Sequence, residues 1–100
     1  MSGEGMIAEA RAVHGDAGMV RLKELMARGT EFLGTEWAIL GGAMSWVSER
    51  NLVSAISNAG GFGVIACGAM TPDLLDTQIA ETKARTKPTF GVNLITMHPQ

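Results

Sequence analysis

Several classes of protein are excluded by what the sequence contains little of. It has a single cysteine, which rules out an internal disulfide framework and a cysteine-rich zinc site. Its 8 basic residues are outnumbered by 10 acidic ones, so no positive surplus is present to attract nucleic acid or an anionic membrane surface. At 100 residues the chain has room for one domain at most.

Long hydrophobic runs are also missing. The longest uncharged stretch, from Val53 to Thr71, is interrupted by serines, an asparagine and several glycines, which makes it too polar to span a bilayer. The segment from Met1 to Gly5 lacks the basic and apolar regions of a secretory signal. Together with the lone cysteine, these features predict a cytoplasmic protein that is not bound to a membrane.

What the sequence has in quantity is apolar residues, glycine and methionine. The hydrophobic fraction of 46% is ordinary for a soluble globular protein and too high for a disordered one. The 7 methionines are adaptable core residues by default. The 13 glycines are clustered, and the positions of these clusters are the main guide to the organisation of the chain.

Residues 1–28 are predicted to form a helical N-terminal arm, separate from a domain at residues 29–100. Helix-forming residues fill both halves of the arm, and the run Gly15–Gly18 interrupts them. A short frayed helix followed by a more regular one is therefore expected. Thr30–Leu33 and Glu36–Leu40, separated by a Gly-Thr pair, suggest two short strands around a turn.

From Trp37 onward, apolar strands are expected to alternate with amphipathic helices. Ser48 is placed to cap one helix, and Gly60 lies where a left-handed C-terminal cap is needed. Thr71 and Pro72 form a strong start for the next helix, a hydroxyl cap followed by proline at the first helical position. The expected strands are 37–40, 63–67 and 89–95, and the expected helices are 49–58 and one from Pro72 that ends at Lys87–Pro88.

This alternation predicts an α/β fold with right-handed crossovers and a parallel sheet. The strand at 63–67 shows no polar alternation, as expected of a strand that is buried on both faces. Both connecting helices would nevertheless lie on one face of the sheet and leave the other face open to water. Because parallel sheets are almost always covered on both faces, the chain is expected to be completed by further sequence or by other chains.

The segment Gly41–Met44 is the first candidate for ligand binding. It follows a strand and precedes a helix, at the edge where α/β sheets bind ligands. Its pair of glycines would let backbone N–H groups approach a flat ligand or an anion closely, whereas the alternative is a turn that needs positive φ. The cluster Gly60–Gly63 follows a helix and opens a strand, so it is not a dinucleotide-binding loop.

Asn93 is the second candidate, because asparagine is disfavoured in strands and costly to bury without a partner. Alternation along the strand places Phe90, Val92 and Leu94 toward the helices. Asn93 then lies on the opposite face with Gly91, near the carboxyl end of the strand. Its carboxamide could offer an acceptor and two donors to a ligand ring, or it could be satisfied by neighbouring backbone.

The remaining reactive residues point less clearly to a site. Cys67 is interpreted as a small buried residue rather than a nucleophile, His14 as a solvated residue of the arm, and His98 as a loop residue able to reach a ligand edge. Trp46 could wall a pocket or pack on the following helix. No metal-ligand spacing, phosphate-binding loop or hydrolase elbow is present, so no catalytic residue and no metal site are assigned.

Three motifs resemble the nitronate monooxygenase (2-nitropropane dioxygenase-like) family, in the same order and at the same spacing. They are Ile39–Ser48, Ala55–Ile65 and Phe90–Leu94, and the resemblance covers about Glu36 to Leu94. The related FMN-dependent enoyl-acyl-carrier-protein reductases share the pattern. The resemblance implies an FMN-binding (βα)8 barrel, of which this chain would hold about three of the eight βα units after a helical lead-in.

The resemblance also implies which residues meet the cofactor. In the family, the loop after the first strand lies against the flavin, and the asparagine of the third strand contacts its ring. The matching positions here are Gly41, Gly42, Ala43, Met44 and Asn93. Family members more often have Gly-Gly-Met or Gly-Pro-Met in this loop, so the intervening alanine puts the register of the contact in question by one residue. The family's phosphate-binding loops and catalytic histidine belong to the later half of the barrel, and neither histidine here matches them.

The function implied is that of an FMN-dependent monooxygenase that oxidises alkyl nitronates with O₂, with this chain inactive on its own. FMN-dependent reduction of an enoyl thioester by a reduced nicotinamide is the alternative within the same superfamily. A non-catalytic module that associates through its open sheet face is the alternative from another class. The expected partners are a small-molecule substrate and the remainder of the barrel or another chain, with homo-oligomerisation as a further option.

Overall fold

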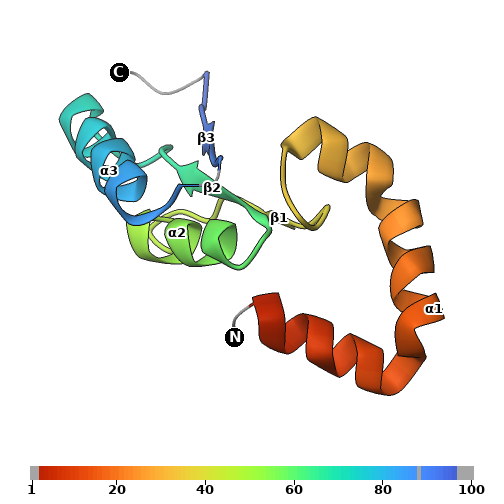
Figure 1. Ribbon diagram of the computed structural model, residues 1–100. Coiled ribbons are helices and arrows are strands. Elements are labelled where there is room, and N and C mark those ends of the chain that lie inside the picture. Colours follow the sequence, from red (N-terminus) through yellow and green to blue (C-terminus); the bar gives the residue numbers. More distant parts are fainter. Residues whose placement is uncertain (1–2, 88, 97–100) are drawn as a thin grey trace.

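Parallel strands and the helices between them form the centre of the molecule. The computed structural model describes residues 3–87 and 89–96, with side chains from residue 15 onward. The strands pair in parallel, and their order in the sheet is β1-β2-β3, which confirms the expected α/β arrangement. In chain order the elements are α1 (Gly3–Leu33), β1 (Leu40–Gly41), α2 (Arg50–Asn58), β2 (Phe62–Ala66), α3 (Pro72–Arg85) and β3 (Gly91–Asn93) (Figure 1).

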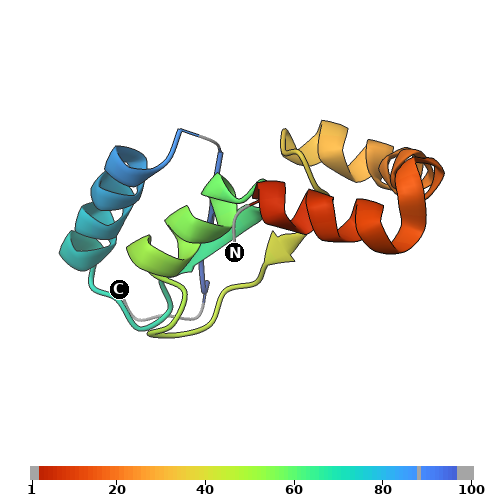
Figure 2. The same ribbon diagram turned by 60° about the horizontal axis from the view of Figure 1, so that its bottom comes forward.

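The N-terminal arm is a helix with one sharp bend. Inside α1, Gly15 has φ of 72° and ψ of 177°, values that lie outside a right-handed helix and suit a residue without Cβ. The interruption predicted at Gly15–Gly18 is thus confirmed at its first residue. Figures 1 and 2 show the two halves of α1 running in different directions, with the second half leading into β1.

The strand expected at Thr30–Leu33 is wrong, because these residues complete α1. The helix ends at Gly34, whose φ is 69° and whose N–H donates to the carbonyl of Thr30 at 2.9 Å, as in a left-handed helix cap. Phe32 is 87% exposed, so this segment has no buried face that would favour a strand over continuation of the helix. The helix therefore extends five residues beyond the arm boundary that was predicted at residue 28.

The first strand is also shorter than expected, because β1 contains only Leu40 and Gly41. Trp37 is held outside the ladder by other hydrogen bonds. Its N–H donates to the carbonyl of Gly60 at 2.9 Å, and its carbonyl accepts from the hydroxyl of Thr35 at 2.6 Å. Trp37 is buried, and Lys23 of α1 places its Nζ 5.9 Å from the centre of the indole ring. This contact joins the arm to the segment that leads into β1.

The hydrophobic core lies between the sheet and the helices α2 and α3. Val53 of α2 and Ile65 of β2 are fully buried, and Met70 completes the centre of the cluster. Ile65 is the register partner of Val92, so both strands turn the same face toward the helices. Figure 2 shows α2 and α3 on one side of the strands, as the sequence predicted. The other core neighbours are Cys67, Leu74, Leu75, Ile79 and Phe90.

The opposite face of the sheet is bare in the part of the chain that the structure describes. Leu40 pairs with Phe62, and Val64 pairs with Gly91, so these residues share the face turned away from α2 and α3. Leu40 is 58% exposed, while Phe62 and Val64 are only half-buried. The expected exposure of one sheet face is therefore confirmed, and such a face normally needs a cover.

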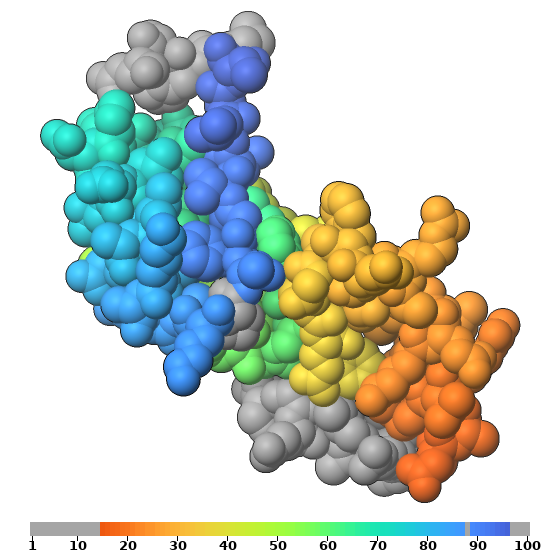
Figure 3. All heavy atoms as spheres, turned by 45° about the horizontal axis from the view of Figure 1, so that its top comes forward, coloured from red at the N-terminus to blue at the C-terminus, as the bar shows by residue number. Residues whose placement is uncertain are grey.

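The start of α3 matches the prediction residue for residue. Thr71 is the N-cap, and its hydroxyl accepts from the N–H of Leu74 at 3.2 Å, while Pro72 occupies the first helical turn. Lys83 and Arg85 lie in the last turn, where their positive charges interact favourably with the negative end of the helix dipole. In Figure 3, α3 and β3 lie side by side, and the second half of α1 stands apart from both.

Replacing the cap tests this assignment. Thr71→Ala is expected to lower the free energy of unfolding by about 1 kcal/mol, because the N–H of Leu74 loses its acceptor. Denaturant titration followed by circular dichroism measures the change. Thr77→Ala is the control, since that hydroxyl donates only to the carbonyl of Asp73 within the same helix and alanine favours helix. Equal losses in the two variants would contradict the capping role.

Candidate functional site

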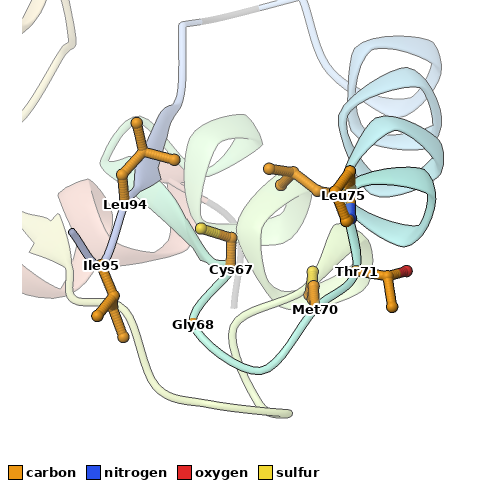
Figure 4. A pocket seen from close by; sticks show the side chains of 8 residues that line it. Cys67, Gly68, Met70, Thr71, Leu75, Leu94 and Ile95 are labelled. Carbon is orange, nitrogen blue, oxygen red and sulfur yellow. The ribbon is translucent and has the colours of Figure 1, made fainter. Parts of the chain in front are cut away.

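The carboxyl edge of the sheet brings the predicted site residues to one end of the molecule. Because the strands are parallel, β1 leads into the loop 42–49, β2 into the loop 67–71 and β3 into residues 94–96, all at the same edge. Figure 4 shows the β2–α3 loop at this edge, next to the end of β3. The edge corresponds to the position where α/β proteins bind their ligands.

The two glycines after β1 have different surroundings. A Cβ on Gly41 would collide with the end of the Ile56 side chain, so this glycine lets α2 pack on the strand. A Cβ on Gly42 would meet nothing within 4 Å, so this position faces open space. Among the described residues, the backbone N–H groups of Gly42 and Ala43 have no hydrogen-bond partner. They are therefore free to donate to a ligand, whereas Gly41 serves packing.

Met44 is the fourth predicted residue of this loop, and its backbone groups form hydrogen bonds within the loop. Its N–H donates to the hydroxyl of Ser48 at 2.9 Å, and its carbonyl accepts from the N–H of Val47 at 3.0 Å and of Ser48 at 2.8 Å. The Met44 backbone is therefore turned inward, while its side chain is 51% exposed. Trp46 has a left-handed φ of 63° and is 66% exposed, so it is presented outward rather than packed on the following helix.

The cap that the sequence assigned to Ser48 is wrong. Glu49 is the N-cap of α2, and its carboxylate accepts from the N–H groups of Asn51 at 2.9 Å and of Leu52 at 3.4 Å. The longer glutamate reaches the helix N-terminus from outside and adds a negative charge there. Ser48 is 2% exposed and bonds instead to the loop before it.

Asn93 ends β3 on the open face of the sheet, as predicted. It is the register partner of Ala66, and its backbone carbonyl accepts from the thiol of Cys67 at 2.6 Å. Its side chain is exposed and makes no hydrogen bond with the other described residues, so neighbouring backbone does not satisfy the carboxamide. Gly42 follows β1 directly, so the register places it level with Val64 and Gly91, two strands across from β3 and two residues before Asn93, a separation of about 12 Å. The open glycine and the open amide thus face the same space.

A small apolar cavity that the sequence did not predict lies beside this edge. It has a volume of about 180 Å³ between β3 and the start of α3, and Cys67 is in its wall with Met70 and Leu75 (Figure 4). Leu94 also lines it but is 71% exposed, so the packing expected for Leu94 against the helices is incomplete. Cys67 is half-buried with its thiol donated to the carbonyl of Asn93, which is consistent with a packing residue.

The two histidines considered in the sequence cannot be placed in the site. His98 and the side chain of His14 lie outside the described residues. In the described part of the chain, no group of three or more histidine, cysteine or acidic side chains is arranged to hold a metal ion. No helix within the same residues has both the length and the apolar character needed to cross a bilayer.

Fold and site together define a parallel α/β segment with an open ligand edge, and the comparisons identify its family. The nitronate monooxygenase family model matches residues 26–100. The chain therefore belongs to the nitronate monooxygenase family, and the resemblance seen in the sequence is confirmed.

Individual relatives show how much of the family fold is present. The chain is 45% identical to a (3aS,4S,5R,7aS)-5-hydroxy-7a-methyl-1-oxo-octahydro-1H-indene-4-carboxyl-CoA dehydrogenase of Mycobacterium tuberculosis. The matched segment has 65 residues and covers 65% of this chain and 18% of that protein. A nitronate monooxygenase of Paraburkholderia phytofirmans is 37% identical over 67 residues, 67% of this chain and 18% of its own length.

Solved structures of FabK from Thermotoga maritima give the same picture in three dimensions. The match has a TM-score of 0.70 and 44% sequence identity, and it covers 72% of this chain and 23% of the FabK chain. FabK is a TIM-barrel protein, and the parallel strands and helices described above match part of it. The chain spans about a fifth of the length of the relatives that it matches.

Proposed function

We propose that the whole protein is an FMN-dependent oxidoreductase on a (βα)8 barrel, and that this chain forms one wall of the cofactor site. The observation that supports this best is that Gly42 and Asn93 both open onto the uncovered face of the sheet, with no hydrogen-bond partner for the Gly42 N–H or the Asn93 carboxamide among the described residues. The glycine leaves room for a flat ring, and the free carboxamide can both donate to it and accept from it. Family membership supports the choice of FMN, because nitronate monooxygenases typically use it.

The residues present fit a flavin in chemistry as well as in space. The free N–H groups of Gly42 and Ala43 suit the carbonyl and nitrogen acceptors of an isoalloxazine, and none of the strand residues that the register places on the open face carries a carboxylate. The exposed side chains of Met44 and Trp46 would help to exclude water from one side. FMN would supply the electron transfer, while these residues bind and orient it. We assign no general base to this chain.

Nitronate oxidation and thioester chemistry are the candidate reactions. Oxidation of alkyl nitronates by O₂ is supported by the family model and by relatives that are named nitronate monooxygenases. Reduction or oxidation of an acyl thioester is the second candidate, because the carboxyl-CoA dehydrogenase has 45% identity against 37% for the nitronate monooxygenase. A small-molecule substrate is proposed in both cases.

The remainder of the barrel is the partner that we propose for the bare sheet face. Leu40, Phe62 and Val64 would become interior residues once the ring of strands closes. The association of copies through the same face is the alternative for a chain that remains incomplete.

The proposal is tested with the purified whole protein. We expect visible flavin absorption and release of FMN on denaturation, and we expect the 100-residue chain alone to show no turnover. O₂ consumption with an alkyl nitronate supports the first reaction, whereas NAD(P)H oxidation with an enoyl-CoA, or reduction of an artificial acceptor by an acyl-CoA, supports the second. A colourless protein that takes up no FMN on titration would contradict the proposal and favour a non-catalytic module.

A further inference from the structure

We propose that Ser48 is the positioning residue that holds the Gly42–Met44 loop in its ligand-binding shape. The inference rests on the proposed function in so far as the ligand is FMN. The loop itself and its hydrogen bonds are independent of the cofactor. Ser48 lies outside the residues that the family resemblance assigned to the flavin, so its role follows from the geometry.

A single buried hydroxyl connects both ends of the loop. The Oγ of Ser48 donates to the carbonyl of Gly42 at 3.0 Å and accepts from the N–H of Met44 at 2.9 Å. These two bonds use the single donor of the hydroxyl and one of its two acceptor positions. Ser48 is 2% exposed, so water cannot readily replace the hydroxyl as the partner of these groups. The path between Gly42 and Met44 is therefore closed into a ring through the Ser48 side chain.

The backbone of Ser48 connects this ring to the sheet. Its carbonyl accepts from the N–H of Ala66 at 3.0 Å, and its own N–H donates to the carbonyl of Met44 at 2.8 Å. Ala66 is the register partner of Asn93. Ser48 thus ties the loop after β1 to the end of β2, which in turn pairs with the end of β3 that carries Asn93. One hydrogen-bonded network therefore holds both halves of the candidate site.

The consequence concerns the free N–H groups of Gly42 and Ala43. Without the hydroxyl, the Gly42 carbonyl and the Met44 N–H lose their partners, and the peptide groups between them can rotate to find others. A ligand must then reorder the loop when it binds, which reduces its affinity. Ser48 would act through these groups and would not itself touch the ligand.

The test uses three variants of the whole protein freed of cofactor. Ser48→Ala is expected to raise the dissociation constant for FMN about fivefold, as judged by flavin fluorescence titration. Ser48→Thr keeps the hydroxyl and should restore affinity. Ser54→Ala is the matched control, because Ser54 is 6% exposed and its hydroxyl donates only within α2, to the carbonyls of Arg50 and Asn51. Equal losses of affinity in Ser48→Ala and Ser54→Ala would overturn the proposal, since a general loss of stability would explain both.

A second measurement decides the question even if Ser48→Ala fails to fold or the protein binds no FMN. In the cofactor-free protein, the Met44 amide should exchange its hydrogen on the order of tenfold more slowly than the Ser45 amide, which has no described acceptor. Slow exchange at Met44 without FMN binding would defeat the proposed function and still support the role of Ser48 in the loop. Exchange at equal rates would overturn that role.

Discussion

Replacing Gly63 with alanine is expected to lower the free energy of unfolding of the whole protein by about 3 kcal/mol. Gly63 lies in β2 on the face that meets α2. A Cβ there would lie 2.6 Å from the carbonyl oxygen of Val53 and 3.0 Å from its Cα. Both atoms belong to the helix backbone, so no rotamer change relieves the overlap. The helix must move away from the strand and open the core around Val53 and Ile65.

Gly42→Ala is the matched control for stability. A Cβ at Gly42 meets nothing within 4 Å, and its backbone does not need positive φ. We therefore expect the free energy of unfolding to change by less than about 0.5 kcal/mol. The denaturant midpoint of each variant, measured by circular dichroism, gives the comparison. Similar midpoints for Gly63→Ala and the unmodified protein would mean that α2 does not lie against β2 as described.

Some parts of the fold could be predicted directly from short stretches of the sequence. The apolar residues from Gly63 to Cys67 predicted a strand, which the structure has at Phe62–Ala66 with only one face covered, and the Thr71–Pro72 pair predicted the start of a helix to the residue. Both signals are local, because burial pattern and capping chemistry act over a few neighbouring positions. The parallel order then followed from helix lengths that require a crossover.

The errors arose where long-range contacts decide. Thr30–Leu33 has strand-forming residues, but α1 continues through it because no neighbouring strand pairs with it and Gly34 supplies the helix end. The expected strand from Trp37 is reduced to two residues because Trp37 bonds to the carbonyl of Gly60, a partner more than twenty positions away. Pairing of this kind is invisible in a single segment.

The candidate site divides in the same way. Asn93 could be singled out because an unpaired amide is rare in a strand, and its position on the open face follows from alternation alone. Ser48 was given the wrong partner because two hydrogen-bonding residues, Ser48 and Glu49, compete for one helix start. Only the path of the loop back to Gly42 determines which of them caps the helix. The apolar cavity near Cys67 depends on how α3 and β3 approach each other, which no sequence pattern specifies.

Asn93→Ala is expected to weaken FMN binding by the whole protein about 10- to 100-fold while leaving its stability nearly unchanged. The carboxamide makes no hydrogen bond with the described residues, so its removal costs the fold little. If the amide contacts the flavin ring, the ring loses a donor and an acceptor inside a closed barrel, where water is a poor substitute. Flavin fluorescence titration and denaturant unfolding measure the two effects separately.

Asn58→Ala is the opposite case and makes the comparison decisive. The Asn58 amide donates to the carbonyl of Arg85 at 3.1 Å, and its oxygen accepts from the hydroxyl of Thr86 at 2.6 Å, so it joins α2 to the end of α3. Its loss should cost about 1 kcal/mol of stability without changing FMN affinity. The two variants thus compare Asn58, whose side chain is hydrogen-bonded within the fold, with Asn93, whose side chain has no partner among the described residues.

The contrast tests why an unpaired amide stands in a strand at all. A strand position gains from a β-branched or aromatic side chain, so Asn93 is there at a cost to the isolated sheet unless something binds to it. The exposed Asn93 side chain and the open space beside Gly42 belong to the same uncovered face of the sheet. If Asn93→Ala binds FMN as tightly as the unmodified protein, that face is an ordinary barrel interior, and the cofactor contacts must come from other strands.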